Sequence, residues 1–298
     1  MSHDQNFKNL ILDYPEQALA LFTADEAPAV GDGASITPLR QEQLQERLGE
    51  RFRELDVPLL VEWPDGRREA LLFVIEEETR TRRFDIHRLA HYCLDLAALC
   101  GTERVVPVVI FLDEGAAAES VTLGGDRQTY LHFRYVACHL ARLPWRGYRD
   151  SDNLVARLNL PNTAWATTAE KLEAFAAAVR GLQALEPDPE RQLKYADFID
   201  IYGTLDEYER ALYDQRYPRE SEAMTGFAER FRTEGREEGM QQGMQQGEAA
   251  VLLRQIERRF GAEAAAHCRD RIERADADTL LEWSERILTA GSVEDVIC

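Results

Sequence analysis

The stretch that decides the fold reads Leu55-Asp56-Val57-Pro58-Leu59-Leu60-Val61-Glu62-Trp63, then Pro64-Asp65-Gly66, and later Ala70-Leu71-Leu72-Phe73-Val74-Ile75-Glu76-Glu77-Glu78. Both apolar runs are rich in Val, Ile, Leu and Phe, which favour strands, and Pro-Asp-Gly is typical of a turn. The stretch therefore predicts a β-hairpin with acidic residues at its open end.

These acidic residues predict a metal site. If Trp63 pairs with Glu69 across the turn, Asp56 pairs with Glu76, and Glu78 returns to the same face two residues later. Three neighbouring carboxylates repel one another unless a cation neutralises them, and their hard oxygens suit Mg²⁺ or Mn²⁺. A register slip of one residue would move Asp56 to the other face and remove the cluster. The alternative to a metal site is that Glu76 to Glu78 form a solvated strand end and that Asp56 is a turn residue.

A family resemblance rests on the order of these motifs. Asp56, then Ile75-Glu76-x-Glu78, then a helix resembles the metal-binding core of the PD-(D/E)xK nucleases. More narrowly, the chain resembles the bacterial recombination-promoting nucleases, a family also grouped with transposases. The supporting matches are Asp4-x-x-Phe7-Lys8-x-Leu10, Arg53-x-x-Asp56, Arg88-Leu89-x-x-Tyr92 and Pro107-Val108-Val109-Ile110-Phe111.

The resemblance implies an α/β fold of the restriction-endonuclease type, a mixed sheet flanked by helices, and Mg²⁺-dependent endonucleolytic hydrolysis of DNA. In it Asp56, Glu76 and Glu78 hold the metal, and these three residues together with Arg80 are catalytic. The chain departs from the family pattern at Glu78, where most of the superfamily has Lys and the narrower family often has Gln. Because a Glu cannot act as a cation, Glu78 adds a metal ligand or Arg80 supplies the positive charge. The alternative is a catalytically inactive descendant that acts as an interaction or oligomerisation module.

Residues near the acidic motif are expected to hold the DNA backbone. Arg88 and Tyr92 are four residues apart on a helix, so both can face a phosphate, although packing is the alternative for Tyr92. Arg82 lies in the basic run that follows the acids, and Lys8 belongs to the N-terminal match. We predict these four residues as the substrate-binding set.

The charge of the whole chain bears on its partners. With 298 residues, a net charge of -19 and a pI near 4.8, the protein is not expected to coat nucleic acid non-specifically. One segment is locally basic and aromatic, which is compatible with a phosphate backbone. It contains Phe133, Arg134, Tyr135, Arg142, Trp145, Arg146, Tyr148 and Arg149. The alternative is that these arginines are solvated at the surface or pair with the excess acids.

The cysteines and the N-terminus predict a cytoplasmic protein without a membrane partner. The five cysteines form no Cys-x-x-Cys pair, so we expect reduced, mostly buried thiols. Residues 1–22 lack the apolar core of a signal peptide, and no apolar run is long enough to span a bilayer.

The remaining pattern predicts helices and strands around the hairpin, followed by a helical half. We divide the chain into a nuclease-like domain (1–160), a helical extension (161–233), a glycine-repeat helix or linker (234–248) and a small C-terminal helical bundle (249–298). The predicted N-terminal elements are helices at Pro15–Phe22, Gln41–Glu54 and Phe84–Leu99, a loop at Ala24–Pro38, and strands at Arg104–Leu112 and Thr129–Cys138. The predicted C-terminal helices are Thr168–Leu185, two pieces within Arg191–Tyr217, Ala249–Phe260, Ala262–Arg274 and Thr279–Thr289.

The last helices also resemble a helical domain of unknown function that often follows such nuclease domains. The residues that carry this resemblance are Leu252-Leu253-x-x-Ile256-x-x-Arg259-Phe260-Gly261 and Leu280-Leu281-x-Trp283-x-x-x-Ile287-Leu288. Ordinary amphipathic helices have the same spacings, so the resemblance implies no activity for this part of the chain.

A glycine repeat precedes these helices. Glycine recurs at every fourth position, at Gly235, Gly239, Gly243 and Gly247. On a helix these glycines form a slowly drifting stripe that a second helix can approach closely. We expect a homo-oligomer through this helix or through the C-terminal bundle, with a flexible linker as the alternative.

Overall fold

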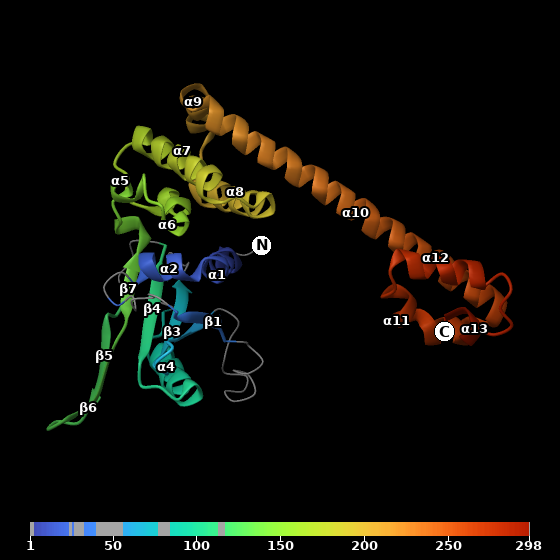
Figure 1. Cartoon of the computed structure of the whole chain (residues 1–298), viewed down its shortest axis with the longest axis horizontal. Helices are drawn as coiled ribbons and strands as arrows, with labels where there is room; N and C mark the ends of the chain where they lie inside the picture. The colour runs from blue at the N-terminus through green and yellow to red at the C-terminus, as the bar shows by residue number, and fades with distance from the viewer. Residues whose placement is uncertain are drawn as a thin grey trace. The chain divides into compact units, whose positions relative to one another are not determined.

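The computed structural model describes residues 3–23, 26, 33–39, 56–76, 84–112 and 117–297. The chain forms two compact units, Met1–Thr225 and Gly226–Cys298. Strands occur in the first unit, whereas the described residues of the second unit are helical apart from short connections (Figure 1). The α/β class and the helical C-terminal part are therefore confirmed, and the finer division into four parts stays a prediction.

The first unit is built on a mixed five-stranded sheet with the strand order β1-β2-β3-β4-β7. Strand β2 is antiparallel to both of its neighbours, β1 and β3, and β3, β4 and β7 are parallel. Their bounds are β1 (Ser35–Pro38), β2 (Asp56–Glu62), β3 (Arg68–Glu76), β4 (Val105–Phe111) and β7 (Val136–His139). The predicted loop at Ala24–Pro38 is wrong at its end, because Ser35–Pro38 pairs with β2.

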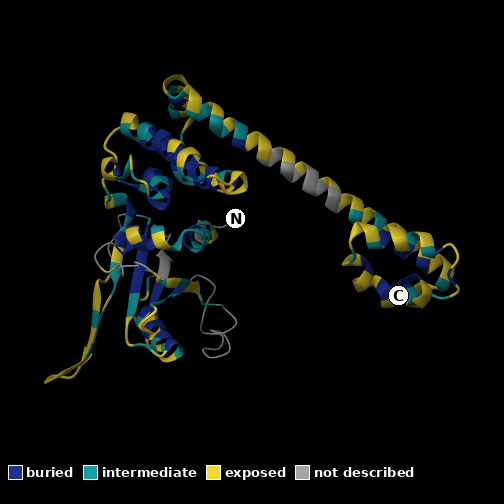
Figure 2. Ribbon diagram, viewed as in Figure 1, coloured by how far each residue is buried: buried dark blue, intermediate teal, exposed yellow. Residues whose placement is uncertain are grey.

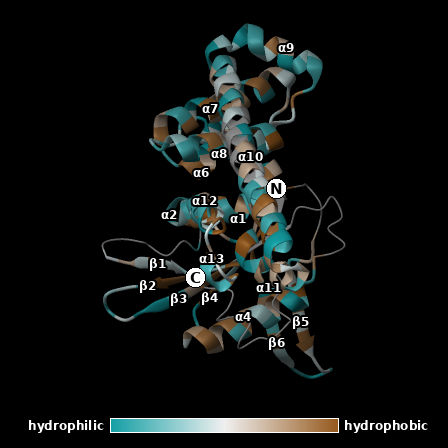
Figure 3. Cartoon of the chain, turned by 90° about the vertical axis from the view of Figure 1, so that its right-hand side faces the viewer, coloured by the Kyte–Doolittle hydropathy of each residue, from teal (hydrophilic) through white to brown (hydrophobic). Residues whose placement is uncertain are grey.

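One helix connects two parallel strands of the main sheet. Helix α4 (Ile86–Cys100) connects β3 to the parallel strand β4. Asp85 caps α4 by accepting hydrogen bonds from two backbone N–H groups of the first turn, and Gly101 ends it in the left-handed conformation that glycine tolerates. Apolar and polar residues alternate along α4 (Figure 3), and its apolar face packs on the sheet around Leu72 and Val109.

A second, two-stranded sheet is formed by β5 (Ser120–Gly124) and β6 (Thr129–Arg134). The single strand predicted at Thr129–Cys138 is therefore wrong, because its first half pairs with β5 and its second half is β7, which pairs with β4. No strand was predicted from the sequence at Ser120–Gly124, where β5 lies.

Helices complete the first unit, and both they and the main sheet contain buried residues (Figure 2). The predicted helix Thr168–Leu185 is confirmed as α7, whose N-cap Thr167 accepts a hydrogen bond from the backbone N–H of Glu170. Pro189 occupies the first turn of the next helix, where its missing N–H is harmless. The helical segments are α1 (His3–Asp13), α2 (Pro15–Phe22), η3 (Leu140–Arg142), α5 (Trp145–Tyr148), α6 (Leu154–Leu158), η4 (Leu160–Asn162), α7, α8 (Pro189–Gly203) and α9 (Glu207–Arg216).

The second unit is a small helical bundle. The glycine repeat is helical, not a linker, because it lies within α10 (Pro218–Phe260). The last helix is capped reciprocally by Ser292 and Asp295, each side chain accepting a hydrogen bond from the other's backbone N–H. The core includes Leu252, Ile256, Ile272, Leu280 and Trp283. The other helices are α11 (Ala262–Glu273), α12 (Ala277–Arg286) and α13 (Glu294–Ile297).

Three sequence predictions have simple outcomes. The four cysteines in the described part of the chain, Cys93, Cys100, Cys138 and Cys268, are free and buried, as expected. Among the described residues, no helix combines the length and the apolar composition needed to cross a membrane. The helix predicted at Gln41–Glu54 lies outside the described residues.

Candidate functional site at the carboxyl edge of the parallel strands

The ends of four strands meet at one edge of the main sheet. In the parallel register Glu76, the last residue of β3, pairs with Phe111, the last residue of β4, and Phe111 pairs with His139 at the end of β7. The antiparallel strand β2 begins at Asp56 at the same edge. Ligand sites of open α/β sheets lie beyond the carboxyl ends of parallel strands, so this edge is the candidate site.

The predicted pairing of Asp56 with Glu76 is wrong, because Asp56 pairs with Val74. The turn causes the difference. Trp63 donates a backbone hydrogen bond to Arg67 and accepts one from Gly66, whose φ of 84° suits a three-residue loop with a bulge. The loop is therefore shorter than the one assumed from sequence, and the register moves by two residues.

A shift of two residues leaves positions 56 and 76 on the same face of the sheet, because side chains alternate between the two faces. Position 76 lies two residues beyond the partner of position 56, which makes the two positions diagonal neighbours. Diagonal neighbours in an antiparallel pair are roughly 7–8 Å apart, against roughly 5 Å for direct partners. The acidic positions therefore stay near each other at the edge, at a wider spacing than predicted.

The rest of the predicted metal and catalytic set falls outside the described side chains. Glu78, Arg80 and Arg82 lie in residues 77–83, and the side chains of Asp56 and Glu76 are also not among those described. The described residues contain no group of three His, Cys, Asp or Glu side chains arranged to hold a metal. The metal triad therefore stays a prediction that rests on backbone positions.

An aromatic cluster, Phe84, Phe111, Tyr135 and His139, lies at the same edge. The ring of Phe84 is 5.8 Å from that of Phe111 and 5.1 Å from that of Tyr135, centroid to centroid. The imidazole of His139 stacks on Phe111 at 4.6 Å with an interplanar angle of 14°. Because Phe84 directly precedes α4, the cluster holds the start of α4 against the ends of β4 and β7.

His139 is a candidate residue that sequence reasoning did not single out. It ends a four-residue strand and belongs to no spacing motif, so only its register reveals its place. Through Phe111 it lies two strands from position 76, which corresponds to roughly 10 Å between backbones. Its half-buried imidazole is therefore one of the described polar side chains at this edge.

The two residues of α4 that were predicted to contact a phosphate differ in burial: Arg88 is exposed and Tyr92 is buried. Arg88 is exposed in the first turn of α4, which suits a contact with an anion. Tyr92 is only 6% exposed and packs with Leu89 and Leu96 in the core, as the packing alternative predicts. Lys8 is half-buried on α1. The substrate-binding roles of Arg88, Tyr92, Arg82 and Lys8 stay predictions.

Two arginines of the basic, aromatic segment pair with acids of α7. Arg146 lies 2.5 Å from Glu170, and Arg149 lies 3.2 Å from Glu173 and 3.0 Å from Asp150. A hydrogen bond from the backbone N–H of Ala166 and one from Arg146 lower the pKa of Glu170. For these two arginines the pairing alternative is confirmed.

No protein-family model, curated protein or solved structure matches this chain.

Proposed function

We propose that the protein is a metal-dependent endonuclease that hydrolyses DNA phosphodiester bonds with Mg²⁺ or Mn²⁺. The observation that supports this proposal most strongly is the register of the hairpin. It puts Asp56 at the beginning of β2 and Glu76 at the end of β3, at the carboxyl edge of the parallel strands. The motif resemblance of Asp56, Glu76 and Glu78 to the PD-(D/E)xK nucleases gives the same assignment.

The residue types at this edge fit a hard divalent cation. Asp56, Glu76 and Glu78 offer only carboxylate oxygens, which Mg²⁺ and Mn²⁺ prefer over nitrogen and sulfur. When bound, the metal would lower the pKa of a water molecule and offset the charge that develops on the phosphate. Arg80 and Arg88 would hold the phosphate oxygens, since the chain has Glu78 where most of the superfamily has Lys.

The local charge of the segment around β5, β6 and β7 supports a polyanionic substrate despite the net charge of -19. Residues 120–149, which include β5, β6 and β7, contain five arginines and only one acid, Asp126. Arg146 and Arg149 are held by acids of α7, whereas Arg127 and Arg134 lie exposed on the β5–β6 hairpin. DNA affinity would therefore come from a local surface and would weaken with added salt.

A second candidate function, a catalytically silent interaction protein, is favoured by Glu78. Most of the superfamily has a Lys at this position, which stabilises the charge on the reacting phosphate, and Glu78 cannot replace that interaction. A silent protein would keep the sheet and the helices but would hydrolyse no DNA.

Cleavage of supercoiled plasmid tests both candidates. We expect nicking by the native protein with Mg²⁺ or Mn²⁺, and a loss of at least about 100-fold in Asp56→Asn and Glu76→Gln, because losing a metal ligand costs at least as much as losing a residue that supports one. The matched control is Glu62→Gln at the opposite end of β2, where Glu62 pairs with Arg68 at 2.7 Å. Folded native protein that cuts no DNA with either metal would favour the silent protein.

A further inference from the structure

One face of α10 is apolar and uncovered. Met240, Met244 and Val251 are 64%, 60% and 55% exposed. Gly247 lies between them, and a Cβ added there would meet no atom within 4 Å. We refer to Met240, Met244, Gly247 and Val251 as the α10 stripe.

The α10 stripe lies on the side of the helix that faces away from the core of the second unit. With 3.6 residues per turn, its four residues fall within roughly 60° of each other. Ala249, Leu252 and Ile256, which are at most 5% exposed, fall on the opposite side of the helix and pack in the core. The stripe is therefore not needed to build the bundle of its own chain.

The spacing of the stripe is that of a helix pairing with a helix. Its residues follow one another at intervals of four, three and four, the alternation by which two α-helices wrap around each other. Nothing in the bundle requires this alternation on an exposed face, where charged residues would keep the helix equally well solvated. The occupant that the pattern fits is another α-helix with the same spacing.

We propose that the α10 stripe is the self-association surface of this protein and that it pairs antiparallel with the stripe of a second copy. In the antiparallel register Met240 lies opposite Val251 of the second copy, and Met244 lies opposite its Gly247. Each large side chain then meets a smaller one, so the helices approach closely at the glycine. A parallel pair would instead put glycine against glycine and leave a gap.

The charges that flank the stripe complement each other in the antiparallel orientation. In the sequence, Glu234, Glu237 and Glu238 precede the stripe, and Arg254 and Arg258 follow it, whereas Arg259 donates hydrogen bonds to the backbone carbonyls of Ile287 and Ala290 in its own chain. An antiparallel pair brings the acidic flank of one copy to the basic flank of the other. A parallel pair would put like charges opposite each other, which is unfavourable.

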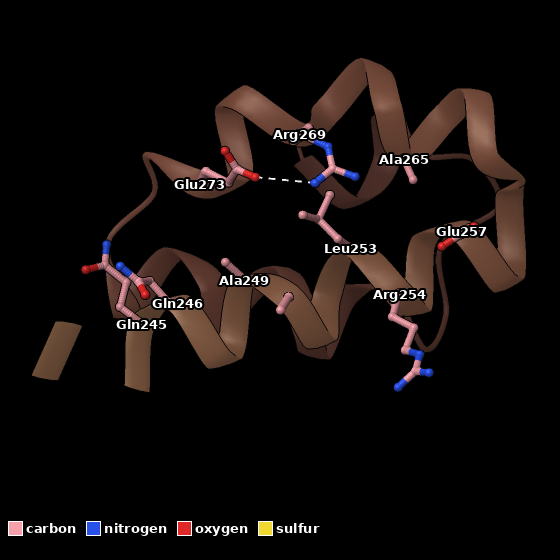
Figure 4. A pocket seen from close by; sticks show the side chains of 10 residues that line it. Gln245, Gln246, Ala249, Leu253, Arg254, Glu257, Ala265, Arg269 and Glu273 are labelled. Atoms are coloured by element: carbon pink, nitrogen blue, oxygen red, sulfur yellow. Dashed lines mark hydrogen bonds and ion pairs between the residues drawn. The ribbon is translucent and has the colours of Figure 1, made fainter. Parts of the chain in front are cut away.

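A groove borders the stripe and adds room for the side chains of a second copy. It lies between α10 and α11, has a volume of about 720 Å³, and is lined by residues that include Ala250 and Arg254, next to Val251 (Figure 4). Arg269 and Glu273, four residues apart on α11, pair at 3.5 Å along one wall of the groove. The groove walls thus carry both charge signs, which allows two copies of the same surface to face each other.

The mass of the full chain in solution tests the association. We expect light scattering to give twice 34.0 kDa at micromolar concentration, and a shift to a single chain in Met244→Asp and in Val251→Asp. Both residues are exposed, so circular dichroism should show unchanged helix content. The matched control is Leu281→Asp on α12, where Leu281 is 59% exposed in the same unit but lies off the stripe. A native mass of 34.0 kDa at every concentration would overturn the proposal. So would a dimer mass that persists in both Met244→Asp and Val251→Asp.

Cross-linking tests the orientation. In a Cys298→Ser background, Met240→Cys mixed with Val251→Cys should give a covalent dimer of the two variants with a short bismaleimide. Each variant alone should give little product, because the antiparallel pair keeps two copies of one position apart. The nearest native thiol, Cys268, is 1% exposed and should not react. Efficient cross-linking of each variant to itself would overturn the antiparallel orientation.

Discussion

Glu69, at the beginning of β3, is 2% exposed and accepts two hydrogen bonds from the guanidinium of Arg104 on the approach to β4. Nε and one terminal nitrogen of Arg104 lie 3.0 Å and 2.8 Å from the same carboxylate oxygen. The pair joins the amino ends of two parallel strands, at the far side of the sheet from Asp56 and Glu76. A buried carboxylate with one charged partner depends on that partner.

We therefore expect Arg104→Ala to lower the free energy of unfolding by about 2–3 kcal/mol, because Glu69 would stay buried without its donor. The control is Arg68→Ala, which removes an exposed pair with Glu62 and should cost less than about 1 kcal/mol. Urea unfolding of both variants measures the difference. Equal losses of unfolding free energy in the two variants would show that leaving Glu69 buried without its partner costs no more than breaking an exposed ion pair.

Asp13 gives a prediction for acid stability. Burial raises the pKa of Asp13, but hydrogen bonds from Lys194 and Tyr195 of α8 outweigh burial and lower the pKa below its ordinary value of 3.8. A carboxyl with a lowered pKa in the folded state adds stability that is complete above 3.8 and is lost as the pH falls through the lower folded value.

Asp13→Asn should therefore lower the free energy of unfolding at neutral pH and flatten its decline below pH 3.8. Chemical unfolding at a series of pH values measures both effects. Asp150→Asn, at a residue whose side chain is 78% exposed, serves as the control and should follow the native curve. An Asp13→Asn curve parallel to the native one would contradict the assigned role of Asp13.

Gly203 gives a prediction about packing. It ends α8 against the ring of Phe175 of α7, and an added Cβ would lie 2.3 Å from that ring. Phe175 is 3% exposed and packs edge-on against Tyr213 at 5.0 Å, so its ring has no free space to move into. Gly203→Ala should lower the free energy of unfolding by about 1–3 kcal/mol.

The control for Gly203 is another helical glycine of the same unit. A Cβ at Gly147 would come no closer than 4.0 Å to Pro144, so Gly147→Ala should leave stability unchanged or raise it by up to about 1 kcal/mol. Thermal unfolding of the two variants compares them. A loss in Gly147→Ala as large as in Gly203→Ala would point to backbone effects instead of a collision with Phe175.

Local pattern was enough for the elements whose stabilising contacts lie close in sequence. The apolar spacing of α4 and α7 predicted these helices, and the continuous apolar run of β4 predicted a strand. The hairpin around Pro64-Asp65-Gly66 followed from its turn residues. In each case the same few neighbouring residues decide both the sequence pattern and the backbone conformation.

The sequence by itself determined the hairpin strands β2 and β3, strand β4 and helices such as α4 and α7, because their backbone conformation and turn chemistry are local. Only the tertiary structure decided which positions meet. The three-residue loop at Pro64-Asp65-Gly66 changed the partner of Asp56 from Glu76 to Val74, and the pairing of β5 with β6 divided the strand predicted at Thr129–Cys138 into two strands. His139 reached the candidate site through its register with Phe111, and Arg146 found its acid 24 residues away. Such partners depend on strand register and helix packing, which no short stretch of the chain encodes.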